Sequence, residues 1–312
     1  MTVALCTLSH APLFGITDPD EGTTADIHAA FDGMRAFIRD FDPQLTIVFG
    51  PDHYNGVFYD MMPPFCIGSK ATSVGDWGTD AGSLPVDRAE ARSLLKSVLA
   101  DGIDIAQSEE LHVDHGISQP LEFLFGKGYT NPIVPIFINC VGLPLGPMSR
   151  IRELGESVGR HVAGLGKRVL IIGSGGLSHD PPVPRLEEAS PEVVERLIDG
   201  RNLSPELRAA REARIVEFGR AYADGATTAQ AINPDFDAIV LRTFADGELT
   251  KVDAWTNEWF EEAGGHSSHE IRTWVAAYSA MAAAGGYDVA STHYWPIVEW
   301  GTGFSLTTAS KK

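Results

Sequence analysis

The chain has 312 residues and a formal net charge of −18, with 42 acidic side chains against 24 lysines and arginines. An acidic balance of this size argues against duplex nucleic acid and anionic membrane surfaces as partners. Hydrophobic residues make up 44% of the chain and charged residues 21%, which is typical of a globular protein. The longest apolar stretch, residues 133–145, is too short to span a bilayer and is interrupted by prolines. We therefore expect neither nucleic acid nor a membrane as a partner.

The cysteines and the first residues indicate the compartment. There are three cysteines, Cys6, Cys66 and Cys140, and no pair has the CxxC spacing. This pattern argues against a disulfide scaffold or a structural zinc site and favours a reducing environment. The apolar residues near the start follow no basic segment, unlike those of a secretory signal. We expect a cytoplasmic protein.

Strands and helices alternate in the first 180 residues. A β-rich run at 2–8 is followed by apolar residues at helical spacing over 23–40 and by an apolar strand at 45–49. This order predicts a βαβ unit whose two strands form a parallel pair. The elements expected next are short strands and loops over 57–77, a helix at 88–99, a strand at 103–106, a short helix at 121–125, a strand at 133–139, a helix at 148–165 and a strand at 168–173.

The remainder of the chain is mainly helical. From 190 to about 260 the pattern is charged and helical, with 207–221 the clearest helix. A further helix follows Gly264-Gly265, and 287–297 is expected to form the last strand. The predicted fold is therefore α/β, with a central, mostly parallel sheet covered by helices on both faces and extra C-terminal helices. We expect residues 1–312 to form a single domain.

The strand at 45–49 ends in a polar loop. After Gly50-Pro51 come Asp52, His53, Tyr54 and Asn55. In an open α/β sheet, ligands bind at the carboxyl ends of the strands, which makes this loop a candidate site. The alternative is a simple turn, because Gly-Pro and Asn-Gly both favour turns and Asp bonds its own backbone.

Histidines follow several of the expected strands. His10, His53 and His179 each come after a strand, and His115 lies in a fourth loop of the same character. Parallel strands share one carboxyl edge, so these loops would converge. Imidazole is the commonest metal ligand and a proton carrier near neutral pH, so a metal or acid–base site is indicated.

Glu270 is the candidate carboxylate for such a site. It stands in the first turn of a helix whose apolar face includes Ile271 and Trp274. The competing interpretation is a capping box, Ser267-x-x-Glu270, in which the glutamate would bond the helix N-terminus. Two histidines and one carboxylate would match the ligand triad of non-haem Fe(II) oxygenases, whereas zinc hydrolysis is the competing chemistry.

Two other motifs fail. The glycines after residue 173 lack the third glycine of a dinucleotide fingerprint, and no P-loop lysine follows them. Gly155-x-Ser157-x-Gly159 matches the GxSxG string, but it lies inside a helical pattern, whereas a nucleophile elbow needs a sharp strand-to-helix turn. We interpret that match as chance.

Taken together, the histidine-containing motifs resemble those of the class III (LigB-type) extradiol ring-cleavage dioxygenases, and the resemblance runs nearly end to end. The strings that carry it are Leu8-Ser-His10, Gly50-Pro-Asp-His53-Tyr-Asn-Gly, Val113-Asp-His115-Gly, Gly173-Ser-Gly-Gly-Leu-Ser-His179 and Ser268-His-Glu270-Ile-Arg-Thr-Trp. The resemblance implies one catalytic domain over 1–312, Fe(II) as cofactor, and extradiol (meta) cleavage of a small catechol by O2 in aromatic catabolism. It also implies a homo-oligomer.

The resemblance further implies individual roles and a substrate. His10, His53 and Glu270 would be the ligands of Fe(II), while His179 would act as base and His115 as acid. The implied substrate is 2,3-dihydroxyphenylpropionate, together with its unsaturated analogue 2,3-dihydroxycinnamate. Alternatives are a dioxygenase for a differently substituted catechol, or a non-catalytic metal-binding protein or zinc hydrolase on the same scaffold.

Overall fold

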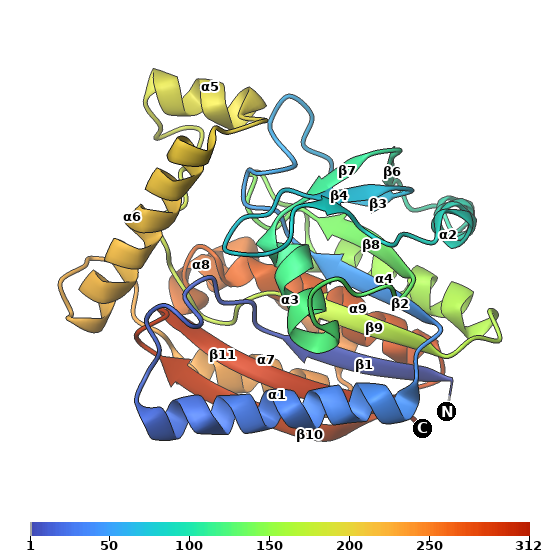
Figure 1. Ribbon diagram of the computed structural model, residues 1–312. Coiled ribbons are helices and arrows are strands. Elements are labelled where there is room, and N and C mark those ends of the chain that lie inside the picture. Colours follow the sequence, from blue (N-terminus) through green and yellow to red (C-terminus); the bar gives the residue numbers. More distant parts are fainter. Residues whose placement is uncertain (1) are drawn as a thin grey trace.

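The computed structural model describes residues 2–312, and its centre is an eight-stranded, mostly parallel sheet (Figure 1). Every residue of its four parallel middle strands is buried, as expected for a sheet covered on both faces. In spatial order these strands are β1 (Val3–Leu8), β9 (Val169–Ser174), β2 (Leu45–Gly50) and β8 (Ile133–Ile138). The predicted α/β class is confirmed.

Further strands extend the sheet at both edges. The antiparallel hairpin of β10 and β11 pairs with β1 through β11, while β3 runs antiparallel to β8 and β6 runs parallel to β3. A second, three-stranded sheet has the order β5-β4-β7. The bounds are β10 Tyr287–Ile297, β11 Thr302–Lys311, β3 Phe65–Gly68, β6 Ala106–Ser108, β5 Gly82–Ser83, β4 Ala71–Ser73 and β7 Leu111–Val113.

Two features of the sheet differ from the expectation. β1 and β2 are parallel but are not a pair, because β9 lies between them and bonds to both. β9 is apolar at Val169–Ile172 and takes a position that is buried on both faces. β11 was not expected, because 287–297 was predicted to be the last strand, and its Ser305 and Thr307 are buried against its neighbours. Strand neighbours are chosen by tertiary packing, which the local pattern does not encode.

Helices cover the two faces of the large sheet. On one face α1 packs against α3 and β11, and on the other α9 and α4 lie side by side against the sheet, with α2 beside α4. The bounds are α1 Glu21–Phe41, α2 Arg88–Ala100, α3 His115–Phe125, α4 Met148–Ala163 and α9 Ile271–Ala283. α3 begins at His115 instead of residue 121, because the side chain of Asp114 accepts the N–H of Gly116 and caps the helix.

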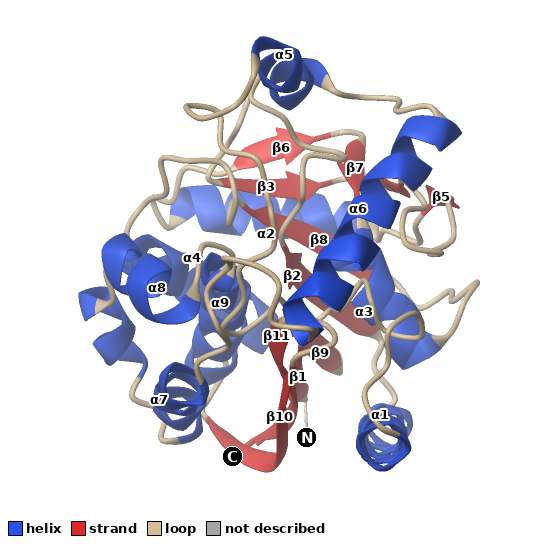
Figure 2. Cartoon of the chain, turned by 90° about the vertical axis from the view of Figure 1, so that its left-hand side faces the viewer, coloured by secondary structure: helices blue, strands red, loops and turns tan. Residues whose placement is uncertain are grey.

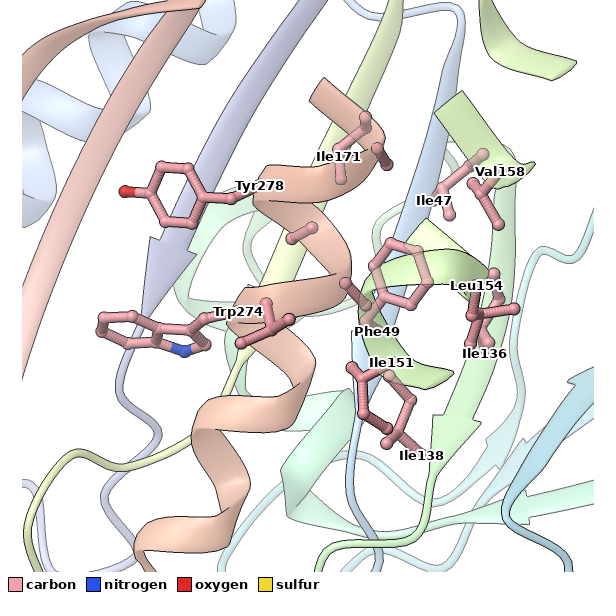
Figure 3. Packing of buried hydrophobic residues seen from close by; sticks show 14 of the residues in the cluster. Ile47, Phe49, Ile136, Ile138, Ile151, Leu154, Val158, Ile171, Trp274 and Tyr278 are labelled. Atoms are coloured by element: carbon pink, nitrogen blue, oxygen red, sulfur yellow. The ribbon is translucent and has the colours of Figure 1, made fainter. Parts of the chain in front are cut away.

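The α4–α9 contact explains the GxSxG string. α9 is buried from Ile271 to Met281, and Figure 3 shows Trp274 and Tyr278 on one side of this helix and apolar side chains of α4, such as Leu154, on the other. A Cβ at Gly155 or Gly159 would come within 2.3 Å of a backbone oxygen of α9. These glycines therefore allow close helix packing, in agreement with the interpretation that the motif is chance.

The extra C-terminal helices lie outside this layered core. α6 buries only Gly219 and stands beyond the carboxyl ends of the parallel strands (Figures 1 and 2). The bounds are α5 Pro191–Asp199, α6 Pro205–Ala223, α7 Pro234–Ala245, α8 Asn257–Gly264, and two 3-10 helices, η1 Leu249–Ala254 and η2 Ser268–Glu270. Over residues 2–312, none of the helices combines the length and apolar character needed to cross a membrane.

Candidate active site

Loops at the carboxyl end of the parallel strands enclose a cavity of about 290 Å³. This end of the sheet faces the viewer in Figure 2, with α6 in front of it. His10 follows β1, His53 follows β2, His179 follows β9, and His115 begins α3 after β7. All four histidines line the cavity, as does Glu270.

Three of the histidine rings are in mutual contact. The ring centroids of His10 lie 5.3 Å from those of both His53 and His115, and the rings of His53 and His115 stack at 4.4 Å. Nitrogen atoms of these three rings lie within 4.8 Å of one another. Segments that are more than 40 residues apart in sequence therefore bring nitrogen donors to one point.

Glu270 places a buried carboxylate beside these rings. Its Oε1 lies 3.0 Å from His53 Nε2 and 3.4 Å from His179 Nε2, and its Oε2 lies 3.4 Å from His10 Nε2. Gly176 N–H donates to Oε2 at 2.6 Å and holds the carboxylate in this orientation. Burial would raise the pKa of Glu270, but the surrounding histidine rings hold it well below its usual range. The group is therefore an anion inside the protein.

The capping-box interpretation of Glu270 is wrong. Within the described chain, Ser267 makes no side-chain hydrogen bond to the helix, and the carboxylate of Glu270 is turned into the cavity. Glu261, another acidic residue close in sequence, pairs with Arg185 at 3.1 Å and does not line the cavity.

The inner nitrogens of two rings are held by neighbours. His10 Nδ1 lies 3.0 Å from Ser174 Oγ, and His53 Nδ1 lies 3.0 Å from Asp114 Oδ2. Both Nε2 atoms consequently face the Glu270 carboxylate. Bonds of this kind to the second nitrogen fix ring orientation in metal sites.

This donor set fits a divalent metal ion. Two imidazole nitrogens and one carboxylate converge, and Asp114 and Glu270 raise the pKa of His53 well above its usual value against the effect of burial. His53 Nε2 and Glu270 Oε1 lie 3.0 Å apart, and a metal ion bound by both would replace this contact. A site of this type with open positions suits Fe(II), and zinc accepts similar donors.

Asp114 lies at the candidate site but was not singled out from the sequence. It is fully buried and accepts hydrogen bonds from the backbone N–H of His53 at 2.8 Å and from Asn55 Nδ2 at 2.9 Å. Burial would raise its pKa, but the rings of His115 and His53 hold it well below the usual range. Its position immediately before His115 was the only signal that could have identified it.

Asp52 is a turn residue. Its carboxylate accepts the backbone N–H groups of Asn55, Gly56 and Val57 at 2.9 to 3.0 Å. Burial and the nearby Asp114 raise the pKa of Asp52 to about 8. The loop therefore combines both interpretations of the sequence: a turn built on Asp52 presents His53 to the cavity.

The other two histidines are held differently. His115 Nδ1 lies 2.6 Å from Asp76 Oδ2, and His179 Nδ1 donates to the backbone oxygen of Leu177 at 2.8 Å. A carbonyl oxygen only accepts, so the neutral His179 ring carries its hydrogen on Nδ1 and keeps a lone pair on Nε2. Burial lowers the pKa of His179, but the Glu270 carboxylate outweighs it and the net shift is upward. Asp76 is the second residue at the site that was not singled out from the sequence; it lies in the 57–77 segment, for which short strands and loops were expected.

Comparison with known proteins finds relatives that match nearly the whole chain. Residues 4–305 match the model of the LigB family, described as the catalytic LigB subunit of aromatic ring-opening dioxygenase. The chain is 56% identical over 309 residues to a 2,3-dihydroxyphenylpropionate/2,3-dihydroxicinnamic acid 1,2-dioxygenase of Rhodococcus jostii (strain RHA1), covering 99% of this chain and 98% of the relative. A protein of the same name from Rhodococcus sp. is 57% identical, and the match covers 99% of this chain and 98% of that relative. One from Dechloromonas aromatica (strain RCB) is 47% identical over 100% of both chains.

A solved structure shares the fold. The crystal structure of an uncharacterized protein from Escherichia coli K12 aligns with a TM-score of 0.51 at 13% sequence identity, covering 97% of this chain and 98% of that one. At this identity the likeness concerns the architecture alone.

Proposed function

Because the chain belongs to the LigB family of aromatic ring-opening dioxygenases, we propose that it cleaves 2,3-dihydroxyphenylpropionate with O2 by the extradiol (meta) route, and 2,3-dihydroxycinnamate as well. The observation that carries this proposal is the convergence of His10, His53 and Glu270 beside two further histidines in one cavity. In this proposal residues 1–312 form one catalytic domain that works in the cytoplasm as a homo-oligomer.

His10 Nε2, His53 Nε2 and the Glu270 carboxylate are the proposed ligands of Fe(II). Their mutual approach to 3.0–3.4 Å supports this assignment, as does the fixing of both Nδ1 atoms by Ser174 and Asp114. Fe(II), when bound, supplies a Lewis acid for the two catechol oxygens and an open position for O2.

Two histidines that are not ligands in this proposal transfer protons. His179 is the proposed base, since its Nε2 lone pair faces the cavity while its Nδ1–H is held by Leu177. It takes a proton from a catechol hydroxyl as the substrate binds. His115 is the proposed acid, because the Asp76 carboxylate at its Nδ1 balances the charge of a doubly protonated ring. It donates its own proton to a substrate oxygen as the ring opens.

Asp76 is a positioning residue in this scheme. We expect Asp76→Asn to lower kcat about 10- to 100-fold with iron content unchanged, because an amide neither fixes the His115 tautomer nor balances its charge. The kcat and KM for 2,3-dihydroxyphenylpropionate would be measured from pH 5.5 to 9, with the exposed Asp80→Asn as control. A purely structural role would instead lower the unfolding midpoint and leave the shape of the pH profile of kcat unchanged.

A direct assay tests the proposed function. The protein, loaded with Fe(II) without air, is mixed with 2,3-dihydroxyphenylpropionate and then exposed to O2. We expect O2 uptake in equal amount to substrate and a yellow ring-opened dicarboxylate. Bound iron with neither colour nor O2 uptake would contradict the proposal. If another catechol in a panel with different ring substituents were cleaved faster, that catechol would be assigned as the substrate instead.

A further inference from the structure

Four arginines gather on one wall of the cavity. Arg196 lies on α5 and Arg208, Arg211 and Arg214 lie on α6, and all four line the cavity. We refer to them as the arginine cluster. The chain has a net charge of −18, so four cations on one wall of the cavity create a region of positive potential in a protein that is negative overall.

The spacing along α6 directs this cluster at the cavity. Arg208, Arg211, Ile215 and Phe218 recur at three- and four-residue intervals, which places them on one face of the helix, and each lines the cavity. The face is cationic towards the start of α6 and apolar further along. A ligand with an apolar body and an anionic end fits such a wall.

The positive charge of the arginine cluster is not neutralised by the protein. Among residues 2–312, no carboxylate lies within 4.0 Å of any of its four guanidinium groups, although nine other arginines form ion pairs. Arg208 Nη1 is a buried atom with no hydrogen-bond partner in the same part of the chain. A buried cationic donor without a partner is costly, so an anion that enters the cavity would relieve it.

Arg211 connects the cluster to the candidate metal site. Its guanidinium donates to His53 O and to Asn55 Oδ1, both at 3.3 Å, which places it over the loop that presents His53. Burial and the nearby Arg196 lower its pKa, although Asp114, Asp52 and Asp76 act in the opposite direction. The one carboxylate of α6 that lines the cavity, Glu212, accepts the backbone N–H of Trp77 at 2.9 Å.

We propose that Arg208 and Arg211 bind the side-chain carboxylate of the substrate, with Arg196 and Arg214 adding positive potential at the same wall. This inference rests on the proposed function and names the part of the substrate that the metal site does not hold. The propionate side chain carries its carboxylate two methylene groups from the catechol ring, and the arginine cluster is the cationic wall of the cavity that would hold this ring. The arginine cluster thus selects catechols with an anionic side chain over neutral ones.

The test compares two substrates that differ only in this charge. In Fe(II)-loaded protein, we expect Arg208→Met to lower kcat/KM for 2,3-dihydroxyphenylpropionate about 10- to 100-fold, the scale of a lost charge-assisted hydrogen bond. For 3-propylcatechol, in which a methyl group replaces the carboxylate, kcat/KM should change less than about threefold. Arg208→Lys should restore part of the loss. Arg220→Met, an exposed arginine of the same helix outside the cavity, should change neither substrate.

Arg211→Met is the second variant, and its iron content is measured because Arg211 contacts the His53 loop. Equal losses for both substrates, or no loss for 2,3-dihydroxyphenylpropionate, would overturn the carboxylate assignment. Binding of 3-phenylpropionate, which has the carboxylate and no diol, is measured without O2 by calorimetry and should weaken about tenfold in Arg208→Met. If the native enzyme cleaved neither catechol, the proposed function would fail, and the 3-phenylpropionate titration would still decide whether the arginine cluster binds a carboxylate.

Discussion

Glu270→Gln is expected to lower the affinity of the protein for Fe(II) at least about 100-fold and to abolish ring cleavage at ordinary iron concentrations. The substitution keeps the shape of the side chain but removes the only anion among the three proposed ligands, and direct ligands contribute more than the 10- to 100-fold typical of groups that orient them. The amide would also place either a donor or a weak acceptor against Gly176 N–H and His53 Nε2.

The measurements separate a ligand from a structural residue. Iron content and the Fe(II) dissociation constant are determined without O2, and the unfolding midpoint is determined on the metal-free protein. Glu261→Gln is the matched control, since Glu261 is close in sequence but pairs with Arg185 away from the cavity. Normal iron affinity in Glu270→Gln, with a stability loss of only about 0.5–2 kcal/mol, would instead be the result of a lost helix cap and would contradict the assignment.

His115→Gln and His179→Gln are expected to bind Fe(II) as the native protein does and to lose about 10²- to 10⁴-fold in kcat, the usual contribution of general acid–base catalysis. Glutamine keeps a polar side chain of similar length, but its amide can neither accept a proton from the substrate nor donate one to it. His112→Gln is the control, because His112 is exposed on β7 three residues before His115.

The pH dependence of the two variants distinguishes their roles. A base must start unprotonated, so removing His179 should abolish the fall of kcat/KM on the acid side, while removing the acid His115 should abolish the fall on the alkaline side. If His179→Gln lost the alkaline fall and His115→Gln lost the acid fall, the roles of base and acid would be reversed. Loss of iron from either variant, to the extent expected for His53→Ala, would show that the histidine is a ligand and not a proton carrier.

The local pattern of the sequence predicted much of the fold. Apolar runs such as 133–139 and 168–173 and the helical spacing at 148–165 correspond to β8, β9 and α4 within a few residues. These predictions succeed because a continuous apolar run, or apolar residues at helical spacing, can be recognised from residues that are close together in the sequence. The helix α3 and the strand β11 show the limit: one begins at a cap made by Asp114, and the other is a polar strand buried by β1 and β10.

The sequence alone identified the groups that could carry the chemistry. These are four histidines that follow strands and a glutamate at the start of a helix, in motifs that resemble one family. The tertiary structure decided which of these groups meet. It inserted β9 between β1 and β2, so that His10, His53 and His179 approach from neighbouring strand ends, and it turned Glu270 from a possible cap into the cavity. The tertiary structure also places Asp76 beside the ring of His115 and Asp114 beside the ring of His53, and it places the arginine cluster on a wall of the same cavity. Contacts between segments so distant along the chain depend on strand order and helix packing, which no local pattern of residues specifies.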